Sequence, residues 1–176
     1  ALAYAARLIK GDKVRTYTIS DSEENEEIKY ARLMSRFISS DHRELIVNPE
    51  KGVEQLPRYI WALEDIDYNH MMLYLLGAFI KGSVKCVLSG HGADEVFLGY
   101  GMYQKPAEYG ERILANISKL REYLSDRDIQ TFEKVGLSFT SLEGLQNMVR
   151  FNQLHELPND NLNLVDRLSM AHGIEV

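Results

Sequence analysis

The loop Ser89-Gly90-His91-Gly92-Ala93-Asp94-Glu95 is the segment of the sequence best equipped for chemistry, because it joins two glycines, a hydroxyl, an imidazole and two carboxylates. It directly follows an apolar run that ends at Leu88. Glycines let backbone amides approach an anion closely, and a carboxylate such as Asp94 can bind a Mg2+ ion that bridges phosphate oxygens. The pattern therefore predicts a phosphate-binding loop. A glycine-rich turn in which Asp94 caps a helix is the alternative.

The hydrophobic pattern predicts the elements that position this loop. Helices are expected over residues 1–10, 21–38, 49–63 and 71–80, and strands over 14–19, 42–47 and 84–88. This alternation is typical of an α/β protein whose mainly parallel sheet is covered by helices on both faces. Ligands bind such sheets beyond the carboxyl ends of the strands, which points to Ser20 and to the loop after Leu88. The part from residue 105 onward is expected to be helical.

Several apolar positions are expected to be buried. In the helix over 21–38, the acidic residues form a solvated start, and an apolar stripe follows them. Its members are Ile28, Ala31, Leu33, Met34, Phe37 and Ile38. Trp61, Met71 and Met72 are further core candidates, and Cys86 is expected in a buried strand rather than as a nucleophile.

Length and composition narrow the class of protein. The 176 residues are 45% hydrophobic, which fits a single domain, with an α/β part over 1–100 and a mainly helical part over 101–176. The formal net charge of −6 argues against a nucleic-acid partner, and the single cysteine excludes an internal disulfide. The longest apolar run, over 71–80, is shorter than the roughly 20 residues of a membrane span. We therefore expect a cytoplasmic protein without a membrane partner.

Two long motifs resemble the asparagine synthetase family. Residues 87–100 read Val-Leu-Ser-Gly-His-Gly-Ala-Asp-Glu-Val-Phe-Leu-Gly-Tyr, similar to that family's SGEGADE(L/V)FxGY stretch, and residues 157–176 resemble its LPDD…DRxSMAxxxEVRVPFLD segment. Tyr17-Thr18-Ile19, the helix with Ala31-Arg32, and His42 stand where the family's second strand, following helix and third strand would lie. The resemblance covers essentially the whole chain.

The resemblance implies an adenine-nucleotide α-hydrolase-like synthetase domain. In that family a carboxylate substrate, aspartate or an analogue, is activated by ATP as an acyl-adenylate, pyrophosphate leaves, and ammonia or an amine attacks. On the matching positions, Ile19 would offer backbone atoms to the adenine, and Ser89, Gly90 and Gly92 would line the nucleotide. Asp94 would bind Mg2+, with Glu95 beside it. A glutaminase domain or subunit and a homodimer are further partners compatible with the family.

The chain departs from the family pattern at the proposed base. His91 stands where asparagine synthetases carry Glu, and lactam-forming relatives have Tyr there, which works with an acidic partner in the later motif. Asp160 falls about where that partner lies, so an orienting His91–Asp160 pair is one interpretation. In the other, both are ordinary loop and turn residues. The changed base also allows a specialised lactam- or isopeptide-forming synthetase.

Two further departures leave alternatives open. The segment over 64–70 lacks the family's proline, and Asp67 and His70 are either ligands or part of a polar loop that opens the next helix. The family's pyrophosphate-binding SGGxDSS loop would immediately precede Ala1, and the second motif is cut off at Val176, so we expect the sequence to be part of a longer protein. A non-catalytic nucleotide-binding module and an unrelated α/β binding domain are the alternatives from other classes.

Overall fold

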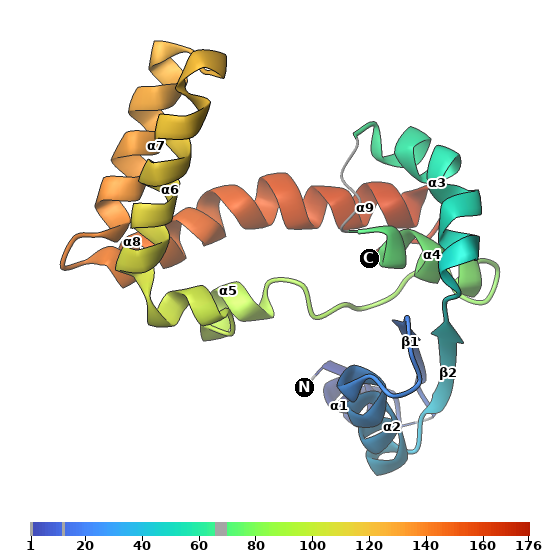
Figure 1. Ribbon diagram of the computed structural model, residues 1–176. Coiled ribbons are helices and arrows are strands. Elements are labelled where there is room, and N and C mark those ends of the chain that lie inside the picture. Colours follow the sequence, from blue (N-terminus) through green and yellow to red (C-terminus); the bar gives the residue numbers. More distant parts are fainter. Residues whose placement is uncertain (1, 12, 66–69) are drawn as a thin grey trace. The chain divides into compact units, whose positions relative to one another are not determined.

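The computed structural model describes residues 2–11, 13–65 and 70–176 (Figure 1). The chain forms two compact units. Unit 1 comprises Ala1–Gly90 and Asn163–Val176, and unit 2 comprises His91–Leu162. Each unit has a hydrophobic core of its own. Within these described ranges, no helix has both the length and the apolar character needed to traverse a lipid bilayer.

The first part of unit 1 is a parallel strand pair with a connecting helix. Helix α1 (Leu2–Lys10) ends at Gly11, which has a φ of +73°, and is followed by β1 (Arg15–Ser20). Helix α2 (Glu26–Ile38) leads to β2 (Asp41–Ile46), which pairs with β1 from Arg15 opposite Asp41 to Ser20 opposite Ile46. Parallel strands require such a crossover connection. The sequence predictions of these two helices and two strands are confirmed.

An ion pair joins α2 to β2. Arg32 donates from Nε to Glu44 Oε1 at 2.9 Å and from Nη2 to Glu44 Oε2 at 2.6 Å. His42 Nε2 lies 3.2 Å from Glu44 Oε1, and His42 Nδ1 lies 2.8 Å from the Thr16 hydroxyl. The hydrogen bonds from Arg32 hold the pKa of Glu44 below its usual value. The polar side of the strand pair is thus tied to the helix that connects the two strands.

This lowered pKa predicts a pH-dependent contribution to stability. A carboxylate with a lowered pKa in the folded state stabilises the protein above its unfolded-state pKa, and that stabilisation is lost as the pH falls through the folded-state pKa. Glu44→Gln should therefore reduce the free energy of unfolding at neutral pH. This reduction relative to wild type should become smaller as the pH falls below 4.5, the ordinary pKa of a glutamate. Denaturant titrations across that range measure this difference. Glu54→Gln, an exposed site on the next helix of the chain, is the control, and a pH-independent difference would contradict the prediction.

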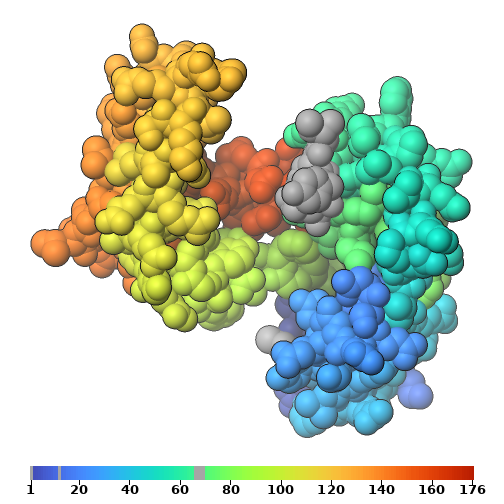
Figure 2. Space-filling view, viewed as in Figure 1, coloured from blue at the N-terminus to red at the C-terminus, as the bar shows by residue number. Residues whose placement is uncertain are grey.

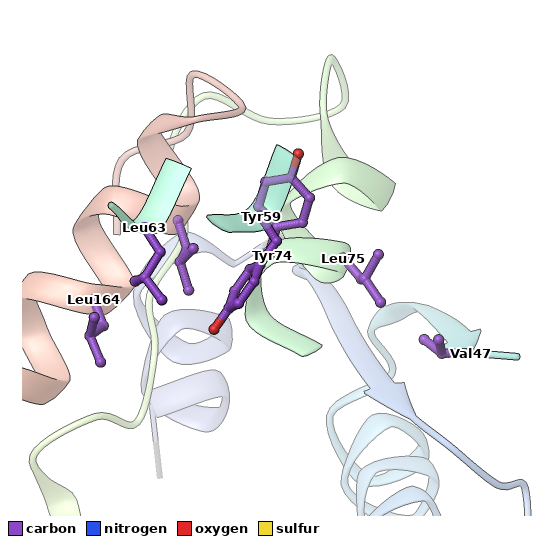
Figure 3. Packing of buried hydrophobic residues seen from close by; sticks show 7 residues of the cluster. Val47, Tyr59, Leu63, Tyr74, Leu75 and Leu164 are labelled. Atoms are coloured by element: carbon purple, nitrogen blue, oxygen red, sulfur yellow. The ribbon is translucent and has the colours of Figure 1, made fainter. Parts of the chain in front are cut away.

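The core of unit 1 lies among three helices, α3 (Pro49–Leu63), α4 (Met71–Ile80) and α9 (Leu162–Met170). The ring of Tyr59 packs edge-on against that of Tyr74, with 5.8 Å between the ring centroids (Figure 3). The other buried members are Val47, Leu63, Leu75, Leu164 and Leu168. Arg167 Nη1 donates to the Leu63 carbonyl at 2.7 Å, which fixes α9 to the end of α3. Met71 and Met72 pack against this core, and the buried helix predicted over 71–80 is confirmed.

Two expectations about buried side chains are wrong for a geometric reason. Trp61 is 86% exposed, because it lies two residues from both Tyr59 and Leu63 and therefore points about 200° away from them around α3. In α2, Ile28 and Ile38 are buried, whereas Leu33 and Phe37 are exposed. The predicted stripe therefore merges residues from two faces of the helix.

The strand predicted over 84–88 is also wrong. This segment makes only isolated bridges, one between Lys81 and Val84 and one between Cys86 and Glu175. Glu175 N donates to the Lys85 carbonyl and Val87 N donates to the Glu175 carbonyl, both at 2.9 Å. The thiol of Cys86 belongs to an exposed residue rather than to the core. The described chain is thus mostly helical with a two-stranded parallel sheet, consistent with an α/β protein, and the larger expected sheet is not seen in this part.

Unit 2 is helical throughout. It contains α5 (Ala93–Phe97), the 3-10 helix η1 (Gly101–Gln104), α6 (Pro106–Leu120), the 3-10 helix η2 (Arg121–Tyr123), α7 (Asp126–Phe139), α8 (Gly144–Phe151) and the π-helix η3 (Asn152–Asn161). Helices α6 and α7 lie side by side (Figure 1, Figure 2). They approach each other closely at Gly110 and Gly136, where an added Cβ on Gly110 would meet the Gly136 carbonyl oxygen at 2.5 Å. Tyr103, Phe139 and Met148 form the buried core of this unit.

Candidate functional site

The motif loop enters unit 2 through a glycine with a left-handed backbone. Gly92 has a φ of +88° and precedes α5 as its N-cap, so the alternative in which Asp94 caps this helix is wrong. A Cβ on Gly92 would lie 3.4 Å from Leu157 Cδ2, which shows how closely the loop approaches η3. A side chain here would be strained by the left-handed backbone, although the contact of its Cβ with Leu157 would be an ordinary one. The glycine therefore lets the loop adopt a left-handed turn where it reaches η3.

Glu95 is the most deeply buried polar side chain of this region, with 2% of its surface exposed. Its Oε1 accepts hydrogen bonds from the Tyr100 hydroxyl at 2.7 Å and from Asn161 Nδ2 at 3.1 Å. Its backbone carbonyl accepts from Gln153 Nε2 at 2.9 Å. Its Oε2 is buried and has no hydrogen-bond partner among the described residues. Glu95 thus joins α5 to both ends of η3.

The π-helix η3 is itself unusual. It runs for ten residues and contains Pro158, which has no N–H for the ladder. Stretches of π-helix are rare and often occur at functional sites. Asn152, at its start, is buried and donates to the Tyr103 hydroxyl at 3.0 Å, which anchors η3 to the core of unit 2. The proposed acidic residue Asp160 lies near its other end.

The electrostatics of η3 and α5 are dominated by carboxylates. The pKa of Glu156 is raised, first by its partial removal from water and then by the negative charges of Asp160 and Glu95. The pKa of Tyr100 is also raised, by burial and by its hydrogen bond to Glu95. Burial is the first cause of both shifts, and the negative charge of neighbouring carboxylates adds to it. Such an environment favours a bound cation over a bare anion.

A Mg2+ ion is compatible with one of the two predicted ligands. Asp94 is exposed on the first turn of α5, and Mg2+ is commonly bound by one or two carboxylates together with substrate phosphates. The carboxylate of Glu95 is engaged by Tyr100 and Asn161 and covered by protein atoms. Across residues 2–11, 13–65 and 70–176, no group of three or more His, Cys, Asp or Glu side chains is arranged to hold a metal. Asp94 fits the ion and Glu95 does not.

The remaining predicted residues fall into two sets. In unit 1, Ile19 is half-buried on β1 and packs against the core, Ser89 is half-buried, and Gly90 is exposed. In unit 2, His91 is exposed as the third residue of the motif loop (residues 89–95), and Asp160 is exposed on η3. The motif loop leads directly into α5, and α5 packs against η3. The structure therefore places His91 and Asp160 on neighbouring segments of unit 2.

Two further candidates lie between α3 and α4 in the sequence. His70 directly precedes α4 as its N-cap, which agrees with a polar loop that opens the helix. Asp67 lies outside the described residues.

Four residues of the site were missed by the sequence reasoning. Tyr100 and Asn161 stand inside the two motifs, at positions where an aromatic hydroxyl and an amide could have been interpreted as partners of a buried acid. Gln153 and Glu156 precede the second motif and carry no sequence pattern of their own. Their roles depend on the path of η3 beside α5, which no local pattern predicts.

Comparisons with known proteins match this chain to one family. A family model described as asparagine synthase matches residues 1–176. The glutamine-hydrolyzing asparagine synthetase of Rattus norvegicus is 28% identical over 126 residues, which are 65% of this chain and 22% of the rat protein. A second such enzyme, from Bacillus subtilis (strain 168), is 27% identical over 112 residues, 61% of this chain and 18% of its own length. The matched region thus spans about a fifth of each relative.

Proposed function

The chain belongs to the asparagine synthase family, and from that premise we propose that it is the nucleotide-binding part of an ATP-dependent amide synthetase. The proposed reaction adenylates a carboxylate, releases pyrophosphate, and ends with attack of ammonia or an amine on the activated carbonyl. Aspartate is the first candidate for the carboxylate, because the relatives are named as asparagine synthetases. The observation that carries the proposal is the motif loop held against η3 within a family match that covers the whole chain.

The first step, adenylation of the carboxylate, needs residues that bind the nucleotide and Mg2+. We assign the nucleotide to the backbone of Ile19 and to Ser89, Gly90 and Gly92, whose glycines allow close approach of phosphate oxygens. Asp94 would hold Mg2+. A bound Mg2+ would neutralise the negative charge that develops on the leaving pyrophosphate. This assignment is supported by the exposure of the Asp94 carboxylate on α5.

We assign the second step to the His91–Asp160 pair. A neutral imidazole can accept a proton from the attacking amine, and a nearby carboxylate stabilises the imidazolium that forms. The support is that α5 and η3 pack together and that both residues are exposed at this place in unit 2. An imidazole in place of the family's glutamate also favours a lactam- or isopeptide-forming variant of the reaction as the second candidate.

The test is a pyrophosphate-release assay on the intact protein with ATP and Mg2+, with aspartate plus ammonia compared against other carboxylate and amine pairs. Carboxylate-dependent release of pyrophosphate together with AMP supports the proposal. Release that requires a carboxylate other than aspartate favours the lactam- or isopeptide-forming variant. Calorimetric ATP binding without turnover for any pair would contradict it and favour the non-catalytic module.

Removing the proposed base should separate the two steps. His91→Ala is expected to slow amide formation by about a hundredfold, a typical contribution of a general base, while ATP–pyrophosphate exchange changes far less. Rapid-quench measurement of both steps checks this. His155→Ala, an exposed histidine on η3 whose ring contacts Phe151, is the matched control and should leave both steps near wild type. Equal loss of both steps, or of neither, would remove His91 from the role of base.

A further inference from the structure

We propose that Glu95 is a positioning residue, whose buried carboxylate fixes α5 against η3 and thereby sets the spacing between His91 and Asp160. The inference rests on the proposed function for its catalytic consequence, but its structural content stands on the contacts of unit 2. Glu95 is thereby assigned to holding α5 against η3 and not to binding Mg2+.

Three of the contacts between the motif loop or α5 and η3 support this inference, and two of these three are hydrogen bonds to Glu95. The first is the approach of Gly92 to Leu157. The second is the hydrogen bond from Gln153 to the Glu95 carbonyl, and the third is the hydrogen bond from Asn161 to the Glu95 carboxylate. Asp160 directly precedes Asn161 in the chain, and His91 lies four residues before Glu95, in the loop that enters α5. The link between Glu95 and Asn161 therefore joins the helix that follows His91 to the residue that follows Asp160.

The cost of burying this carboxylate argues against a role in stability alone. Both donors to Oε1 are neutral groups, and Oε2 has no partner among the described residues. A buried charge without a cationic partner is unfavourable, and an apolar residue of similar size often stabilises a core better. A carboxylate is nevertheless the side chain that accepts from Tyr100 and Asn161 at one oxygen while its charge strengthens both bonds. The cost of burying Glu95 therefore favours a role in fixing the geometry of α5 and η3 over a role in stability.

A polarity swap tests the link. Asn161→Asp places a second carboxylate against Glu95, so α5 and η3 should be driven apart. Glu95→Gln leaves an acceptor for Tyr100 and Asn161 but weakens both bonds. In the double variant Glu95→Gln/Asn161→Asp, the amide introduced at position 95 donates to the carboxylate introduced at position 161. The hydrogen bond is then restored with reversed polarity and with the same net charge as in wild type.

We expect Asn161→Asp to slow amide formation by about thirtyfold and Glu95→Gln by about threefold, and the double variant to return to within about threefold of Glu95→Gln. Pyrophosphate exchange should change by less than about threefold in all three, because the link acts on the second step. Parallel loss of both steps without rescue would show a merely structural role and overturn the proposal. Loss of pyrophosphate exchange in Glu95→Gln by about a hundredfold would instead identify a metal ligand and overturn it as well.

Hydrogen exchange separates this inference from the proposed function. Amides of residues 93–97 and 152–161 should exchange faster in Asn161→Asp and recover protection in the double variant, whatever the protein catalyses. Asn116→Asp, at an exposed position on α6, makes the same change from amide to carboxylate and controls for the added charge. If wild type shows no pyrophosphate release but the swap restores protection, the proposed function fails and the positioning role stands. Unchanged protection in Asn161→Asp overturns the positioning role.

Discussion

Replacing Asp94 by alanine is expected to lower ATP-dependent pyrophosphate release by about a thousandfold or more, about 4 kcal/mol of transition-state stabilisation. Asp94 is the exposed carboxylate of the motif loop, whereas the adjacent Glu95 is buried and bonded to protein groups. In the proposed reaction, Asp94 is the residue of this pair that would hold the Mg2+ that neutralises the leaving pyrophosphate. Stopped-flow measurement of pyrophosphate release at saturating ATP and Mg2+ gives the rate directly.

The fold should survive this change, because the side chain lies on the surface of a five-residue helix. Glu111→Ala removes the same charge from an exposed position of α6 and should leave the rate unaltered. Gly99→Ala offers a second route to the same carboxylate, since its Cβ would lie 1.8 Å from Asp94 Oδ1 and must displace it. Undiminished release in Asp94→Ala, with unaltered circular dichroism, would remove this residue from the reaction.

Sequence reasoning performs well where one local pattern decides the structure. The bounds predicted for α3 and α4 agree with the structure because Pro49 opens one helix and the uninterrupted apolar run over 71–80 favours a buried helix. Gly11 ends α1 in the left-handed conformation that glycine adopts without strain. In each case the deciding residues lie within or beside the element itself, so no distant contact is needed to predict it.

It fails where the deciding partner lies far away along the chain. The run over 84–88 has the composition of a buried strand, yet its described long-range backbone partner is Glu175, which makes a single bridge to it. Leu33 and Phe37 have apolar side chains, but the angular position of each residue on α2 relative to β1 and β2 decides its burial. An apolar residue is a candidate for the core only if a second element covers its face.

In the candidate site, too, local patterns predict some features and distant contacts decide the others. The loop itself is evident from its residue types, and so is the apolar segment that precedes it. The difference between two adjacent carboxylates is not evident: Asp94 is exposed and Glu95 is bonded to Tyr100 and Asn161, five and 66 residues away. Burial separates a candidate ligand from a structural acid here, and only the path of η3 reveals it.

The contact between α6 and α7 yields the largest expected loss of stability. Gly110→Ala adds a Cβ that would lie 2.5 Å from the Gly136 carbonyl oxygen and 3.0 Å from Phe139 Cβ. Neither neighbour is the flexible end of a long side chain, so the helices must separate. Overpacking of this kind costs about 1–3 kcal/mol or more, which exceeds the ~1 kcal/mol that alanine gains over glycine inside a helix. Because the closest neighbour is a backbone oxygen, the cost falls in the upper half of this range, and we expect a net decrease of about 1–2 kcal/mol in the free energy of unfolding.

Gly52→Ala on α3 separates packing from helix propensity, because a Cβ there has no atom within 4 Å. It makes the same chemical change in a helix, so propensity alone predicts that both variants become more stable by up to ~1 kcal/mol. Packing at the two sites predicts opposite signs: Gly52→Ala stabilises and Gly110→Ala destabilises. Urea unfolding followed by circular dichroism measures both. Two stabilised variants would show that α6 and α7 do not meet at Gly110, and the arrangement of unit 2 around that crossing would then be wrong.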